Sequence, residues 1–154
     1  MPRISSKLVF SAVFALSTTA CATQSGDKAW VELGNKRFQV EIADDDAERS
    51  RGLMFRDAMA ADHGMLFVHD FEAPQAYWMK NTHIPLDILY FDSNRKLVAQ
   101  QRNVPPCNAG DACPSYPSDV PATYVLELNA GNADAMNLKN GAELKVSPNA
   151  IPAK

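Results

Sequence analysis

The stretch from Tyr77 to Asp92 constrains the fold more than any other, because it places polar side chains inside apolar, aromatic-rich sequence. Its two aromatic-rich runs are typical of β-strands, since such side chains suit a pleated, half-buried surface. Pro85 interrupts the connection between the two runs. In the second run, alternation places Asp87 on the same face as Leu89 and Phe91. A carboxylate among such neighbours loses hydration, so Asp87 must be paired, hydrogen-bonded or protonated.

Similar runs recur along the chain and predict about eight short strands. Besides the two runs of the opening stretch, they lie at 29–33, 36–42, 64–68, 96–101, 124–128 and 142–146. Two short helices are expected: one in 44–52, with Asp45 and Glu48 at capping-box spacing, and one in 132–139, which Asn140 and Gly141 end. The pattern predicts a mainly β fold: a single compact antiparallel β-barrel-like domain with two short helices.

The first residues have the features of a secretory signal. Arg3 and Lys7 precede a short apolar run at 8–16, and small residues then lead to Ala20. This run is too short to span a membrane as a helix. We therefore divide the 154 residues into a signal peptide at 1–20, a linker at 21–28, a single β-rich domain at 29–148 and a tail at 149–154. The protein is expected to be exported, and in particular periplasmic.

Cys21 leaves two interpretations open. Cleavage before Cys21 would free its thiol for lipid attachment, as in bacterial lipoproteins, and would give the protein a membrane anchor. Ala20 and Ala22 also satisfy an ordinary signal peptidase, which would release a soluble protein. We favour the lipoprotein, because a lone cysteine at this junction otherwise has no partner.

Cys107 and Cys113 form a pair inside a loop rich in proline and glycine. An oxidising compartment would allow them to close a disulfide. Metal binding is the rival interpretation, but no second cysteine pair or histidine lies beside them. The three histidines of the chain also lack ligand spacing. We expect a disulfide, no metal and no cofactor.

The charge of the chain argues against nucleic acid as a partner. There are 15 Lys and Arg against 18 Asp and Glu, and the formal net charge is −3. The basic residues do not cluster into a patch or a stripe. We expect no nucleic-acid partner and a monomeric protein.

Four motifs together resemble the bacterial and archaeal family catalogued as domain of unknown function 192. They are RGLMFR at 51–56, GMLF at 64–67, WMKNTxIPLD at 78–87 and VLELxAG at 125–131, where x is a position outside the motif. The resemblance covers nearly all of the chain after the leader, from Trp30 to Val146. It implies a β-barrel-like fold and frequent export with a signal peptide, and it brings no established activity, substrate or cofactor.

The polar residues inside these apolar motifs are the candidates for a site: Arg51, Lys80, Asn81, Thr82, Asp87 and Glu127. An unpaired buried charge costs several kcal/mol or more, so we expect these side chains to meet. The leading hypothesis is a charged pocket that binds a small polar or anionic molecule. Arg51 would grip an anionic oxygen, and Trp78 and Tyr77 would form apolar walls.

Other interpretations of the same residues stay open. Arg51 and Asp87 could form an internal salt bridge without a ligand, and Lys80 to Thr82 could be a polar turn. Asp87 and Glu127 could serve an envelope hydrolase as acid and base, since glycoside hydrolysis needs two carboxyl groups at the scissile bond. The protein could also be an interaction module that docks on an envelope partner, with purely structural internal charges.

Overall fold

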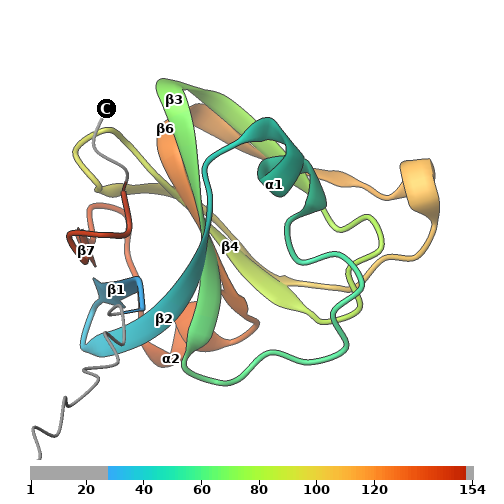
Figure 1. The fold of residues 1–154 in the computed structure, drawn as a ribbon, viewed down its shortest axis with the longest axis horizontal. Coiled ribbons are helices and arrows are strands. Elements are labelled where there is room, and N and C mark those ends of the chain that lie inside the picture. Colours follow the sequence, from blue (N-terminus) through green and yellow to red (C-terminus); the bar gives the residue numbers. More distant parts are fainter. Residues whose placement is uncertain (1–27, 152–154) are drawn as a thin grey trace, which may run out of the picture.

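The computed structural model describes residues 28–151, which form one curled sheet of seven strands with two short α-helices (Figure 1). Along the chain the elements are β1 (Trp30–Leu33), β2 (Lys36–Ala43), α1 (Asp46–Arg51), β3 (His63–Trp78), β4 (Leu86–Phe91), β5 (Leu97–Val104), the short 3-10 helix η1 (Gly110–Ala112), β6 (Ser115–Asn129), α2 (Asn132–Ala135) and β7 (Leu144–Val146). The strand order in the sheet is β5-β4-β6-β3-β2-β1-β7. The predicted signal peptide and Cys21 lie outside the described residues.

The sheet confirms the predicted β-rich, barrel-like design, with one difference in strand direction. β2 and β3 pair in parallel, from Gln39 opposite His63 to Ala43 opposite Phe67. The other strand pairs of the sheet are antiparallel. α1 lies between β2 and β3 in the sequence, and it returns the chain so that both strands run in the same direction.

Strands β3 and β6 are much longer than predicted, with 16 and 15 residues. The sequence predicts a strand only at 124–128 of β6, because Pro117 and Pro121 precede it. In the sheet Pro117 lies opposite Ala76, and Pro121 lies opposite Pro74. A proline is tolerated in a strand where the missing N–H has no bond to make. The irregular register of the β3–β6 pair therefore lets the strand extend through both prolines.

Alternation along the strands sends side chains into two separate apolar clusters. One cluster includes Leu89 of β4 and Leu126 of β6, and the other includes Ile88 and Val125 of the same two strands. Successive residues of a strand point to opposite faces of the sheet. The curled sheet therefore buries apolar side chains on both of its faces.

Gly64 lets β3 and β6 approach closely. A Cβ atom at this position would lie 2.6 Å from the backbone oxygen of Glu127 and 2.7 Å from a methyl group of Leu128. Only a residue without a side chain fits at such a distance. This glycine fixes the backbone of Glu127 against β3.

Helix α1 stands beside β3 at the point where β2 ends its pairing (Figure 1). The side chain of Asp45 accepts the N–H of Glu48 at 2.8 Å, which confirms the predicted cap. Gly52, with φ of 46°, ends the helix and donates its N–H to the carbonyl of Glu48. Among the described residues no strand pairs with β3 on this side beyond Phe67. We call the opening between α1 and the His69–Trp78 half of β3 the seam.

The predicted disulfide between Cys107 and Cys113 is present, with Cα atoms 5.9 Å apart. The N–H of Cys107 donates to the carbonyl of Thr82 at 3.2 Å. The backbone of Cys107 also forms single β-bridge pairings with Lys80 and with Thr82. The disulfide loop is therefore held against the segment that carries the candidate residues Lys80 and Thr82.

Candidate functional site

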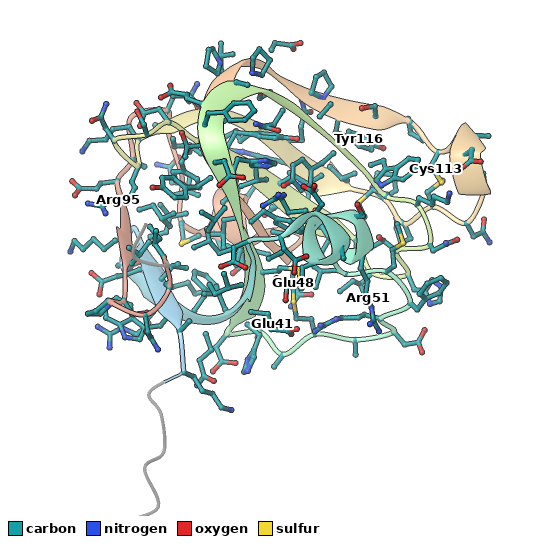
Figure 2. All side chains as sticks on the ribbon, turned by 45° about the horizontal axis from the view of Figure 1, so that its top comes forward. Glu41, Glu48, Arg51, Arg95, Cys113 and Tyr116 are labelled. Carbon is teal, nitrogen blue, oxygen red and sulfur yellow. A yellow bond between two sulfur atoms is a disulfide. The ribbon has the colours of Figure 1, made fainter. Side chains whose placement is uncertain are left out.

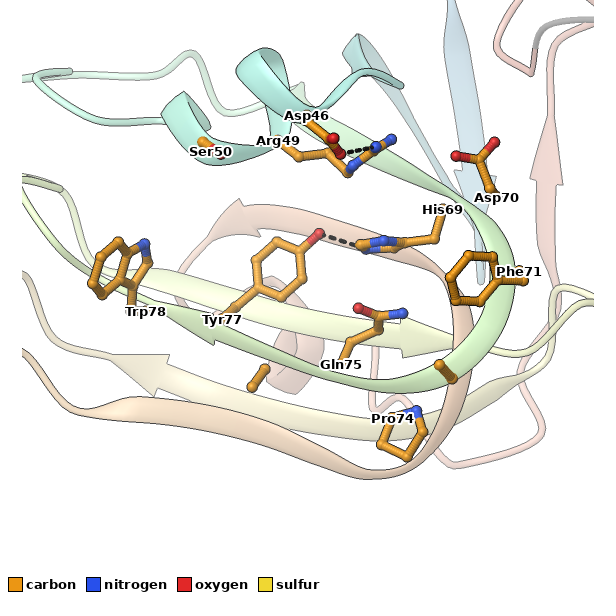
Figure 3. A pocket seen from close by; sticks show the side chains of 12 residues that line it. Asp46, Arg49, Ser50, His69, Asp70, Phe71, Pro74, Gln75, Tyr77 and Trp78 are labelled. Atoms are coloured by element: carbon orange, nitrogen blue, oxygen red, sulfur yellow. Dashed lines mark hydrogen bonds and ion pairs between the residues drawn. The ribbon is translucent and has the colours of Figure 1, made fainter.

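The seam contains a cleft of about 640 Å³ (Figure 3). Arg49 and Ser50 of α1 line one side, and His69, Gln75, Tyr77 and Trp78 of β3 are among the residues of the other. A recess of about 30 Å³, roughly the volume of one water molecule, shares Arg49, Ser50, Tyr77 and Trp78 with the cleft. Arg51, Lys80, Thr82 and Glu127 also line the recess. The structure thus brings four of the predicted polar residues, and Trp78, to one place.

Glu127 lies in this recess with only 4% of its surface exposed. Its carboxyl group makes no hydrogen bond or ion pair with any of the described residues. Burial raises the pKa of Glu127 to about 8, because the charged form loses its hydration. The group is therefore mostly a neutral carboxylic acid at pH 7, with one O–H to donate and one oxygen to accept.

Tyr77 joins the recess to the cleft. Its hydroxyl is hydrogen-bonded to Nε2 of His69, with 3.0 Å between the two atoms (Figure 3). Burial, with the nearby Glu127, raises the pKa of Tyr77, so its phenol stays protonated. Burial and the positive charge of Arg49 lower the pKa of His69. Both side chains are therefore neutral at pH 7.

Two cations stand at the edge of the recess. Arg51 is exposed on the last turn of α1 (Figure 2). Its guanidinium has no hydrogen bond or ion pair within the described range. Lys80 pairs with Asp111 of η1, and its ammonium lies 4.8 Å from the ring centroid of Trp78. Arg51 is therefore available to an anion, while Lys80 would have to share its charge with Asp111.

Arg49, which the sequence did not single out, fixes the wall of the site. Its guanidinium pairs with Asp46 of the same helix at 2.6 Å (Figure 3). It also donates to the carbonyl of Val68 at 2.8 Å, and this hydrogen bond ties α1 to β3. His69 and Gln75 were also missed, because neither falls in a motif. Arg49 was missed because it lies outside the motif that begins at Arg51, and the sequence does not show which way its side chain points.

Asp87 does not belong to this pocket, contrary to the prediction. It is completely buried, and its carboxylate accepts the N–H groups of Asn103 and Ala133, each at 2.8 Å. The alternative of an Arg51–Asp87 salt bridge is also wrong. Asp87 bonds to backbone groups away from the recess, whereas Arg51 lines the recess. Asp87 therefore joins β4 to the end of β5 and the start of α2.

Asn81 is a turn residue and does not line the recess. Its φ is 53°, a left-handed conformation that asparagine tolerates better than most residues, and its carbonyl accepts the N–H of Phe55 at 2.7 Å. The interpretation of 80–82 as a polar turn thus fits Asn81. It does not describe Lys80 and Thr82, which line the recess.

The arrangement is suited to binding more than to acid and base catalysis by two carboxyl groups. Glu127 lies opposite Ile88, and Asp87 lies opposite Leu128, so the two carboxyl groups point to opposite faces of the sheet. A glycosidase needs both groups at one scissile bond. Asp87 and Glu127 therefore cannot act as acid and base at one scissile bond.

Residues 28–151 contain neither a metal-binding cluster nor a membrane-spanning helix. No group of three or more His, Cys, Asp and Glu side chains in this part of the chain is placed to hold a metal ion. No helix within residues 28–151 has the length and apolar character needed to cross a membrane.

Two solved structures are similar to this one over most of its length. A crystal structure of a candidate transcription regulator from Sinorhizobium meliloti 1021 shares 36% identity, with a TM-score of 0.71, over 77% of this chain and 92% of that chain. A protein of unknown function from Novosphingobium aromaticivorans DSM 12444 shares 30% identity, with a TM-score of 0.70, over 75% of this chain and 83% of its own. The comparison with curated proteins finds no match.

The family comparison agrees with the four motifs. The profile of DUF192, described as "Uncharacterized ACR", matches residues 29–146, which is nearly the whole described domain. This match over more than half of the chain shows that it belongs to the DUF192 family.

Proposed function

We propose that the protein binds a small polar ligand with an anionic group in the seam, with one end of the ligand in the recess at Glu127. The observation that carries the proposal is the Glu127 carboxyl group, which is buried and unpaired among the described residues but borders an opening. A buried polar group without a partner is costly. A ligand that hydrogen-bonds to Glu127 would remove this cost.

The neighbouring side chains suggest the chemistry of the ligand. Arg51 offers a fork of donors without a protein partner, and such a fork suits a carboxylate or a phosphate. Neutral Glu127 would donate its O–H to a hydroxyl or carbonyl oxygen of the ligand. Trp78, with 44% of its surface exposed, offers a flat apolar wall. Sugar phosphates, nucleotides and organic acids combine these features.

The volumes of the two openings support binding of only part of the ligand in the recess. The recess is about 30 Å³ and takes a single polar group, whereas the cleft is about 640 Å³, within the usual range of ligand pockets. The body of the ligand would therefore lie in the cleft, against Tyr77 and Trp78.

A ligand screen by thermal shift tests the proposal on four proteins. Sugars, nucleotides and carboxylates are added to the wild type, Arg51→Ala, Arg37→Ala and Glu127→Met, which removes both the donor and the acceptor at the end of that side chain. Arg37 is a matched control, because it is an exposed arginine on β2 that stacks on Trp30, and it lines neither opening. A true ligand raises the Tm of the wild type and of Arg37→Ala by similar amounts. In Arg51→Ala and in the Glu127 variant the increase in Tm should be at most half as large. If no compound stabilises the wild type more than the site variants, the proposal is wrong.

We also propose that the protein is exported and carries a lipid on Cys21. The Cys107–Cys113 disulfide supports export, because such bonds persist in oxidising compartments. The basic and apolar pattern of residues 1–20 supports a signal peptide. Mass spectrometry of the protein purified from membranes tests this: an acylated peptide that begins at Cys21 is expected. An unmodified peptide that begins beyond Cys21 would rule out the lipid, and an intact Met1 would rule out cleavage.

A further inference from the structure

One edge of β3 is open along the seam. β2 occupies this edge only as far as the pair of Ala43 and Phe67. From Phe71 to Trp78 the described residues pair β3 with β6 alone, and helix α1 lies across the cleft from the free edge. A free strand edge presents unpaired N–H and C=O groups, which are a template for another strand.

The two prolines of β6 indicate which backbone groups face the seam. Pro117, opposite Ala76, has no N–H, so these two residues cannot exchange a pair of hydrogen bonds. The N–H and C=O of Ala76 must then point away from β6, toward the seam. Since orientation alternates along a strand, the N–H of Trp78 points the same way. In agreement, Gln75 points its N–H to the β6 side, where it donates to Ser118 Oγ at 3.0 Å.

We propose that the seam binds an extended peptide as an added strand on β3, parallel to it, with the carboxy-terminal end of the peptide at Arg51 and Lys80. This inference deepens the proposed function, since the anionic group at Arg51 becomes the terminal carboxylate of the peptide. Strand addition to a sheet edge is a common mode of peptide recognition, with main-chain hydrogen bonds for affinity and side-chain contacts for specificity.

The direction of the peptide follows from the existing strand and from the charges. β2 runs parallel to β3 on this same edge, so a parallel peptide continues the sheet where β2 leaves it. Acidic Asp70 and Glu72 lie at one end of the open edge, and basic Arg51 and Lys80 lie at the other. A parallel peptide places its positive amino end near the acids and its carboxylate near the cations, whereas the antiparallel direction reverses both contacts.

Exposed aromatic rings mark both ends of this edge. Phe71 has 74% of its surface exposed and Trp78 has 44%, and both line the cleft. These two rings would contact side chains near the two ends of the peptide. Pro74, between them, has no N–H to offer, so hydrogen bonding concentrates at Ala76 and Trp78. The peptide would therefore be short, and its last residues would make the main-chain contacts.

The test starts from a synthetic library of random heptapeptides with free carboxyl ends, selected on the disulfide-bonded protein. The best peptide is made again as the free acid, as the carboxy-terminal amide, and with N-methyl groups on alternate residues. Binding is measured by fluorescence anisotropy. We expect the N-methylated form to bind at least tenfold more weakly. Ala76→Pro should weaken binding of the free acid to the same extent, while the matched Ala76→Gly keeps the N–H and stays within about threefold.

Amide hydrogen exchange gives a readout that does not depend on a variant. In the free protein Ala76 and Trp78 should exchange fast, and the peptide should slow both. A spin label on the carboxy-terminal residue should broaden the Trp78 amide signal more than that of Phe71. Unchanged exchange at Ala76, equal binding of the N-methylated peptide, a reversed broadening pattern, or no heptapeptide with a Kd below about 1 mM would each overturn the inference.

The three peptides separate this inference from the proposed function. If the amide loses affinity but the N-methylated peptide does not, the anion pocket stands and strand addition is wrong. If the N-methylated peptide loses affinity but the amide and the free acid bind equally well, strand addition stands and Arg51 has no anion-binding role.

Discussion

Asp87 and Glu127 lie on adjacent strands, one pairing position apart, and their carboxyl groups point to opposite faces of the sheet. Asp87 is fully buried and accepts two backbone N–H groups. Glu127 is almost as deeply buried, but it has no partner among the described residues and it borders an opening. Two acids with similar sequence surroundings therefore have different roles. Asp87 stabilises the fold, and Glu127 is the candidate for ligand contact.

Replacement of Asp87 by Ala should lower the free energy of unfolding by about 2 to 4 kcal/mol, because two N–H groups then lose their acceptor. Urea unfolding measures this change. Asp87→Asn is the control and should lose less, since its amide keeps one oxygen as an acceptor. Any ligand found for the seam should still bind the folded fraction of both variants. A loss of less than about 1 kcal/mol for Asp87→Ala would contradict the structural role.

The stability of the protein should fall as the pH rises, because of Glu127. Its pKa is about 8 in the folded protein, against 4.5 as the ordinary value. Between these two values the folded state keeps a proton that the unfolded state has released, so stability declines from about pH 4.5 to pH 8. Thermal unfolding of Glu127→Gln between pH 5 and pH 9 is the comparison. We expect the variant to have a flatter pH profile than the wild type, and parallel profiles would show that Glu127 does not titrate in this way.

Gly64→Ala should destabilise the sheet at the β3–β6 crossing. The added Cβ would lie 2.6 Å from the Glu127 backbone oxygen, so the strands must move apart. Such overpacking costs about 1 to 3 kcal/mol. Chemical unfolding of the wild type and Gly64→Ala provides the test. A loss of less than about 0.5 kcal/mol, the usual effect of a surface substitution, would contradict the close approach.

Loss of the disulfide should destabilise the protein by roughly 2 kcal/mol, the value that chain entropy gives for so short a loop. The double variant Cys107→Ser, Cys113→Ser measures this by urea unfolding. The double variant should also hold the Lys80 side chain less firmly, because Asp111, the ion-pair partner of Lys80, lies inside the loop. Thiol labelling of the unreduced wild type is the control, and labelling at both cysteines would show that no bridge forms.

The alternation of apolar residues predicted the β-rich fold, and the acidic start of α1 predicted its cap at Asp45. The presence of Cys107 and Cys113 as a pair in one loop predicted the disulfide between them. These features depend on residues close together in the chain, where turn chemistry, periodicity and loop closure act directly. The lengths of β3 and β6 could not be predicted this way, because a proline is acceptable or not according to the strand opposite, as at Pro117.

The order of residues alone shows which side chains are polar within apolar strands, and on this basis Glu127, Arg51 and Asp87 form one group. The folded contacts separate them: Glu127 and Arg51 share a recess, while Asp87 lies on the other face of the sheet. Strand register causes this separation. A shift of one residue in strand pairing moves a side chain to the opposite face, and contacts among β4, β6 and α1 fix that register over long distances in the chain.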